Sequence, residues 1–113
     1  MLSRAAVAAL MTAALLTTVS AIDPALAQPA AATVKISNLT FGPQAITITA
    51  GTTVTWTNDD DLPHTVVATD KSFRSKPLDT GDRFSFTFAK PGAYAYFCSI
   101  HPMMTGKVVV KAP

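Results

Sequence analysis

A short run near the C-terminus holds several side chains that bind soft metal ions. Between Cys98 and Met104 lie the only cysteine of the chain, one of its two histidines (His101) and two adjacent methionines, the first being Met103. A thiolate, an imidazole and a thioether suit copper in both of its common oxidation states. The other histidine, His64, lies upstream. The chain thus offers the donors of a trigonal His₂Cys copper site with a weak axial methionine.

Other metal centres need ligands that this chain lacks. A structural zinc site takes four cysteine, histidine or carboxylate ligands, but the chain has one cysteine and two histidines, with Asp59–Asp61 as the nearest acids. Attachment of a c-type haem needs Cys-x-x-Cys-His, which is absent. Iron–sulfur clusters need more thiolates. The residues therefore predict copper.

Each candidate ligand also has a structural interpretation. A single cysteine is commonly a small buried hydrophobe, and methionine commonly fills gaps in a core. An isolated histidine such as His64 is more often a structural residue than a ligand. The combination favours the metal site, because the histidines and the cysteine occur in the numbers that such a site requires.

The N-terminus indicates export. Arg4 precedes an uncharged apolar stretch, residues 5–21, and Ala25-Leu26-Ala27 fits the small-residue cleavage pattern of a signal peptide. We therefore expect residues 1–27 to be a secretory signal peptide and residues 28–113 to be the mature domain, located in the periplasm. Cleavage after Ala21 and an uncleaved membrane anchor are the alternatives. A lone exported thiol cannot form an internal disulfide, and metal ligation accounts for it.

Size and charge limit the remaining choices. Removing residues 1–27 from 113 leaves 86, enough for one small domain. Without Arg4 and Asp23 the net charge stays at +2, which is too weak to indicate binding to nucleic acid or to an anionic membrane. We expect a monomer that is not inserted in the membrane once the signal peptide is removed.

The mature chain is predicted to be all-β. Short apolar alternations separated by Gly, Pro, Asn and Asp indicate a Greek-key β-sandwich of about seven to eight strands, expected to be antiparallel. Trp56 and the alternating Phe84, Phe86 and Phe88 are expected to face inward. Residues 70–82 are predicted to form a long crossover connection. The expected strands cover residues 33–37, 45–49, 53–57, 64–68, 83–88, 93–98 and 107–111.

These strands explain how the ligands could meet. Cys98 ends one expected strand, and the next begins at Lys107, so the residues between them form a hairpin loop that brings His101 back toward the thiolate. His64 begins a different strand. In a sandwich the ends of several strands meet at one pole, and that pole can collect the whole set.

The chain resembles the cupredoxins, which are small blue-copper electron carriers. The spacing Cys98-x-x-His101-x-x-Met104 is similar to that of the short-loop amicyanin type, and Pro63-His64 matches the upstream Pro-His pair of the family. The resemblance implies that His64, Cys98 and His101 are equatorial copper ligands and that Met104 is the axial one, with Met103 on the surface. Thr65 departs from the pattern. Many members have Asn there, which ties the two ligand segments together by hydrogen bonds, and here we expect the Thr65 hydroxyl to bond to the region of Ser99.

The resemblance implies a periplasmic one-electron carrier that is not an enzyme. Its implied partners are transient redox proteins, such as an amine-oxidising dehydrogenase as donor and a c-type cytochrome as acceptor. A copper storage or delivery protein is the alternative. Two features are candidates for partner recognition. One is an apolar patch of Leu62, Pro63, Pro102 and Met103, and the other is a pair of charge clusters, Asp59–Asp61 and Lys71, Arg74 and Lys76.

Overall fold

The computed structural model describes residues 13–14 and 30–113. The predicted signal peptide lies outside this part of the chain apart from residues 13 and 14, so its boundary stays a prediction. Across the described residues there is no helix long and apolar enough to cross a membrane. The elements are all strands: β1 (Ala31–Ser37), β2 (Thr40–Gly42), β3 (Ala45–Thr49), β4 (Thr52–Asn58), β5 (Val67–Ala68), β6 (Arg83–Phe88), β7 (Gly92–Phe97) and β8 (Thr105–Lys111).

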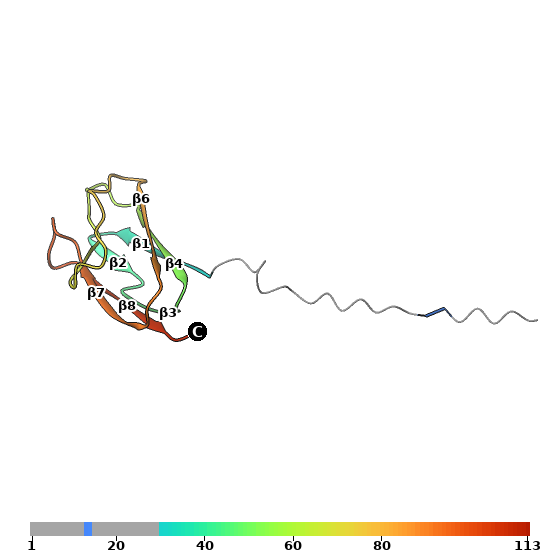
Figure 1. Cartoon of the computed structure of the whole chain (residues 1–113). Helices are drawn as coiled ribbons and strands as arrows, with labels where there is room; N and C mark the ends of the chain where they lie inside the picture. Colours follow the sequence, from blue (N-terminus) through green and yellow to red (C-terminus); the bar gives the residue numbers. More distant parts are fainter. Residues whose placement is uncertain (1–12, 15–29) are drawn as a thin grey trace, which may run out of the picture.

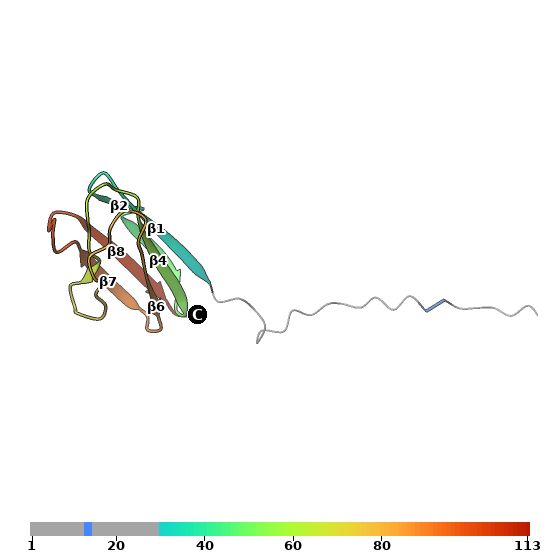
Figure 2. The ribbon, with the colours of Figure 1, turned by 90° about the horizontal axis from the view of Figure 1, so that it is seen from above.

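The strands form two four-stranded sheets, in the orders β2-β1-β4-β6 and β3-β8-β7-β5. Figures 1 and 2 show the sheets face to face, with the loop between β7 and β8 at the opposite end of β8 from the C-terminus. Every connection from β2 to β7 passes from one sheet to the other. The predicted all-β sandwich is confirmed.

Both sheets are mixed, so the expectation of a purely antiparallel sandwich was wrong. β1 pairs with β4 in parallel, with Val34 opposite Trp56, and β3 pairs with β8 in parallel. Parallel neighbours cannot be joined by a tight hairpin and need a longer crossover. Between β1 and β4 the chain first forms β2 in the same sheet and then β3 in the opposite sheet. The crossover therefore runs through the opposite sheet.

Two strand assignments also need correction. The expected strand at residues 64–68 is only Val67–Ala68, and His64 instead forms an isolated bridge with Leu78. The strand β2 was missed, because its three residues lie in a segment that reads as a turn. The connection of residues 70–82 does link the two sheets as predicted, and it buries Phe73 and Leu78 in the core.

Trp56 lies at the centre of the core, fully buried. On β4 the alternate residues Thr52, Val54, Trp56 and Asn58 are buried, as the period of a strand requires. The indole contacts rings from both layers, with centroid distances of 5.7 Å to Phe84 and 5.4 Å to Tyr96. This packing holds the sheet that contains β4 against the sheet that contains β7.

Gly106 permits close packing beside the loop. It lies opposite Tyr96 in the β7–β8 ladder, and a Cβ at this position would overlap the Tyr96 ring. The hydroxyl of Tyr96 and Nε1 of Trp56 are buried without a hydrogen-bond partner among the described residues. The side chain of Tyr96 is therefore held by close packing, while the backbone at this end of β7 is held by its pairing with β5 and β8.

Candidate metal centre

Three of the predicted ligands converge at one pole of the sandwich. One donor atom from each of His64, Cys98 and His101 lies within 4.8 Å of the others. The Cys98 Sγ atom is 3.8 Å from Nδ1 of His64 and 3.9 Å from Nδ1 of His101. His64 and Cys98 are completely buried, whereas His101 is half-buried.

These separations fit a single first-row metal ion. With metal–sulfur and metal–nitrogen bonds of about 2.3 and 2.1 Å, a trigonal arrangement places sulfur and nitrogen about 3.8 Å apart. Both Cys98–His distances have this length. One thiolate and two imidazoles are too few for a closed structural zinc site, while they form the trigonal plane of a blue-copper site.

The loop that carries Cys98 and His101 is closed by its own backbone. The Cys98 N–H donates to the Met104 carbonyl at 3.1 Å, and the Met104 N–H donates to the His101 carbonyl at 2.9 Å. The two methionines then point to different environments, because Met104 is 4% exposed and Met103 is 96% exposed. Met104 alone of the pair is placed in the buried cluster that contains Cys98.

Comparison with known proteins places this arrangement in a family. The model of the cupredoxin-like domain matches residues 6–110. The chain is a cupredoxin. A curated relative, amicyanin-alpha from Methylorubrum extorquens, is 38% identical over 97 residues, which cover 80% of this chain and 82% of that protein. Other curated relatives are amicyanins and plastocyanins.

Solved structures agree with this membership. A purple cupredoxin from Nitrosopumilus maritimus superposes with a TM-score of 0.69 at 40% identity, covering 71% of this chain and 99% of that one. A Cu-containing nitrite reductase from Thermus scotoductus gives a TM-score of 0.70 at 37% identity, covering 82% of this chain but 27% of the reductase. Copper is the cofactor that the family and the donor set indicate, and together they indicate a type 1 copper electron carrier.

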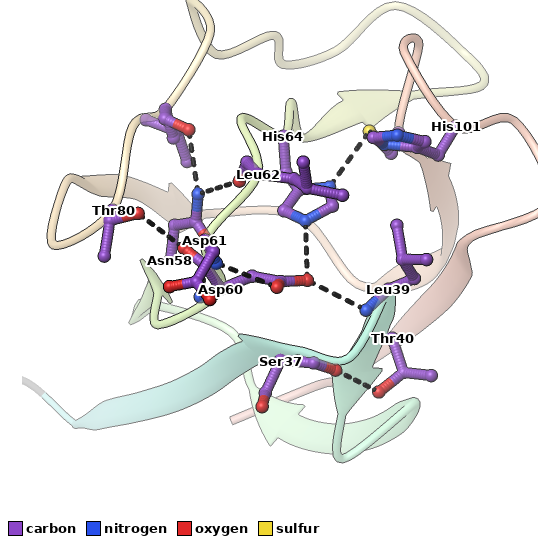
Figure 3. A network of polar contacts seen from close by, with 12 residues as sticks. Ser37, Leu39, Thr40, Asn58, Asp60, Asp61, Leu62, His64, Thr80 and His101 are labelled. Atoms are coloured by element: carbon purple, nitrogen blue, oxygen red, sulfur yellow. Dashed lines mark hydrogen bonds and ion pairs between the residues drawn. The ribbon is translucent and has the colours of Figure 1, made fainter.

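In this cupredoxin His64 is held from both sides. Its backbone bonds to Leu78 in both directions, at 3.0 and 2.7 Å. Its Nε2 lies 3.0 Å from Oδ2 of Asp60 (Figure 3). A carboxylate only accepts, so Nε2–H donates and the Nδ1 lone pair is left facing Cys98. Carboxylates in this position orient metal-binding histidines and raise their basicity.

Asp60 is a partner of His64 that the sequence did not reveal. Its carboxylate also accepts the Leu39 N–H at 3.0 Å. This bond has the largest effect on the pKa of Asp60, and together with the bond from His64 it holds that pKa below the usual range. Asn58 positions the segment, since its amide bonds the Leu62 and Leu78 carbonyls and its Oδ1 accepts the Asp60 N–H. The sequence of residues 59–61 indicates a charged, solvated turn, but the side chain of Asp60 points toward the buried His64.

Thr65 joins the two ligand-bearing segments, as expected from its place after His64. Its backbone N–H donates to Cys98 Sγ at 3.3 Å, and its hydroxyl accepts the Ser99 N–H at 2.7 Å. The same hydroxyl lies 2.8 Å from the Ser99 hydroxyl and 3.7 Å from the sulfur. Thr65 therefore makes the contact between segments that the family's Asn implied.

The site lowers the pKa of the cysteine. Burial of Cys98 raises the pKa of its thiol, but hydrogen bonds to the sulfur, first that of the Thr65 N–H, stabilise the thiolate more strongly. The rings of His64 and His101 add to this effect only while the nitrogen that faces the sulfur carries a proton, which it gives up when it binds a metal. Together they lower the pKa from 9.0 to about 6. The thiolate is the form that binds a metal, so the fold prepares this ligand before any ion arrives.

Exposed apolar residues lie beside His101, and we call the group of Leu39, Ile100, Pro102 and Met103 the apolar rim. Leu62, Pro63, Pro102 and Met103 are all exposed, as the sequence predicted. The structure adds Leu39 and Ile100, each 44% exposed, which line a hollow of about 390 Å³ together with Met103 and His101. The sequence did not place Leu39 beside His101, because β2 and the turn before it were not predicted.

Proposed function

We propose that this cupredoxin is a periplasmic one-electron carrier. We assign His64, Cys98 and His101 as the equatorial copper ligands and Met104 as the weak axial ligand. The convergence of the three nitrogen and sulfur donors at distances suited to one ion supports this assignment. The burial of Met104 at the end of the same closed loop supports its role over that of Met103.

The bound metal would supply one-electron chemistry between Cu(I) and Cu(II). The protein's part is to keep its ligands still, because a set that need not rearrange passes an electron with a small barrier. Asp60 fixes the ring of His64, and Thr65 fixes Cys98 through bonds to the sulfur and to Ser99. Burial of His64 and Cys98 keeps water from this side.

The half-buried ring of His101 is the proposed point of electron exchange. It lines the hollow with Ile100 and Pro102 on the apolar rim. Exposed apolar patches often mark interaction sites, and electron-transfer encounters are typically small and transient. A monomer with this surface is suited to brief contacts with redox proteins, for which an amine-oxidising dehydrogenase and a c-type cytochrome are the proposed donor and acceptor.

The proposed location rests on the N-terminal sequence. Arg4, the apolar residues 5–21 and the small residues before Gln28 have the order of a secretory signal peptide. We propose that residues 1–27 are removed on export and that residues 28–113 are the copper domain. N-terminal sequencing of the protein recovered from the periplasm tests both points. Recovery of an intact N-terminus in the membrane fraction would contradict them.

The carrier proposal is tested by spectroscopy of residues 28–113 loaded with Cu(II). We expect a strong visible thiolate-to-copper charge-transfer band, a type 1 EPR signal, and reversible one-electron reduction. A copper storage or delivery protein would instead lose its ion readily to a weak competing chelator. Absence of the visible band from the stoichiometrically loaded protein would rule out the carrier.

The likeness to a nitrite reductase does not extend to an enzyme proposal. This chain corresponds to 27% of that reductase. A further catalytic metal would need its own ligands and an open position for substrate. Both histidines of the 113 residues are already in the proposed site, so none remains to bind a second metal.

A further inference from the structure

Two adjacent methionines of this loop differ sharply in their access to solvent. Met103 is 96% exposed, the highest value among the exposed large hydrophobic residues of the described chain, whereas Met104 is 4% exposed. Both methionines line the two hollows at this pole, one with His101 and Ile100 and the other with Phe41 and Gln44, so the difference between them is their exposure. The thioether of Met103 is therefore open to small reagents and lies beside the proposed point of electron exchange.

We propose that Met103 is a modification site at which peroxides form methionine sulfoxide. A sulfur lone pair attacks one oxygen of the peroxide, an S–O bond forms and the O–O bond breaks. The departing hydroxide takes the proton of the transferred hydroxyl group and leaves as water. Sulfur loses two electrons and the peroxide gains them, so hydrogen peroxide is the only co-reactant required. Methionine sulfoxide is also reversible by reductases.

The structure directs this reaction away from the metal centre. Met104 is nearly inaccessible and Cys98 is completely buried. Susceptibility to oxidation follows exposure and, for a cysteine, thiolate character. Cys98 has thiolate character but is buried and is a proposed metal ligand in the loaded protein, so Met103 reacts first. A peroxide that reaches this pole is then consumed by a side chain that is not a proposed ligand, and the copper site keeps its spectrum.

Oxidation would change the surface through which electrons are exchanged. Sulfoxide formation turns a flexible apolar side chain into a polar one. Met103 contributes to an apolar hollow of about 390 Å³ with Leu39, Ile100 and Pro102. A polar group there must lose its water when an apolar partner surface approaches, which weakens the encounter. This consequence rests on the proposed carrier function, whereas the selectivity for Met103 does not.

The test treats the oxidised, copper-loaded protein with hydrogen peroxide. Peptide mass mapping locates the added oxygen, and NMR or rapid freezing measures electron self-exchange between two copies of the protein before and after treatment. We expect one oxygen on Met103, none on Met104, an unchanged visible band, and self-exchange slowed by about three- to tenfold. Self-exchange needs no knowledge of the natural partners.

Met103→Leu and Met103→Gln supply the matched controls. Whatever its starting rate, Met103→Leu should show the same rate before and after peroxide, because the sulfur is gone. Without any treatment, Met103→Gln should exchange electrons as slowly as the peroxide-treated protein.

Preferential oxygen uptake by Met104, or equal slowing in Met103→Leu, would overturn the proposal. Oxidation of Met103 without slowing would overturn its effect on exchange. If the untreated protein showed no self-exchange, the carrier function would be contradicted. The modification site would still be decided by the mass data.

Discussion

The imidazole of His64 donates a hydrogen bond from Nε2 to the carboxylate of Asp60 at 3.0 Å. The same carboxylate holds the N–H of Leu39, a residue with a φ of 59° that lies on the apolar rim. The side chain of Leu39 is 44% exposed to solvent, while its backbone N–H is bound to Asp60 (Figure 3). One buried proposed ligand and one part of the outer surface are therefore positioned by a single side chain.

Replacing Asp60 with Asn should weaken copper binding by about 10- to 100-fold, the usual loss when a partner of a metal-binding histidine is removed. The reduction potential should rise, because loss of the negative charge disfavours Cu(II). Competition with a chelator and a redox titration measure the two effects. Asp61→Asn is the control, since the Asp61 side chain is exposed and only its backbone contacts Asp60. Equal effects of the two variants would contradict the assigned role.

Replacing Thr65 with Val should destabilise the protein by about 1–3 kcal/mol, because the part-buried N–H of Ser99 loses its acceptor. The visible band should also shift, since the hydroxyl lies 3.7 Å from the sulfur. Denaturant unfolding and absorption spectra check both expectations. Thr65→Ser keeps the hydroxyl and should retain most of the stability. If Ser behaves like Val, the hydrogen bonds are not the cause.

Replacing Met104 with Ala should alter both the spectrum and the reduction potential, because the proposed axial ligand is lost. It should also cost about 2–5 kcal/mol of stability, as is typical when a buried methionine is truncated. Met103→Ala should leave the spectrum and the stability nearly unchanged. Absorption, EPR and thermal unfolding of the two variants provide the comparison. The opposite pattern would show that the ligand is Met103.

The copper-free protein should contain a thiolate at neutral pH. The folded pKa of Cys98 is about 6, below its ordinary value of 9.0. Between these values the unfolded chain binds a proton that the folded chain has lost, so the free energy of unfolding should rise with pH. This contribution is complete above pH 9 and is lost as the pH falls through about 6. Ultraviolet titration of the thiolate measures the pKa, and a midpoint near 9 would contradict it.

Two substitutions at the β7–β8 contact should differ clearly in their effect on stability. Gly106→Ala should destabilise the protein by about 1–3 kcal/mol, because the new methyl group overlaps the Tyr96 ring. Tyr96→Phe should cost little or should stabilise, since its buried hydroxyl has no hydrogen-bond partner in the described part of the chain. Denaturant unfolding compares them. A large loss in Tyr96→Phe would reveal a polar contact to the hydroxyl.

Much of the fold could be predicted from local patterns. The alternation that buries Val54 and Trp56 on β4 is plain in the sequence, and β3 and β6 have the predicted bounds. The parallel pairing of β1 with β4 could not be predicted in this way. Alternation shows which face of a strand is buried, but it contains no information about the neighbour's direction.

The site shows a similar division. The spacing of Cys98, His101 and Met104 predicted a loop that gathers its own ligands, and the backbone bonds of that loop agree. Asp60 was not recognised as a partner of His64, because an aspartate in such a run is usually a solvated turn residue. Its inward direction depends on the turn that Asn58 organises through three hydrogen bonds, and such a turn is specified by tertiary contacts.

The two halves of the metal centre are far apart along the chain. His64 and Cys98 are separated by 34 residues, a span that includes the long connection with Phe73 and Leu78. One ion bound to both residues closes this span like a cross-link, and such closure restricts the unfolded chain. Loading with copper should therefore protect the connection of residues 70–82 from proteases, although the metal lies at the pole. In this small domain the proposed redox centre would then also stabilise the fold by closing a long loop.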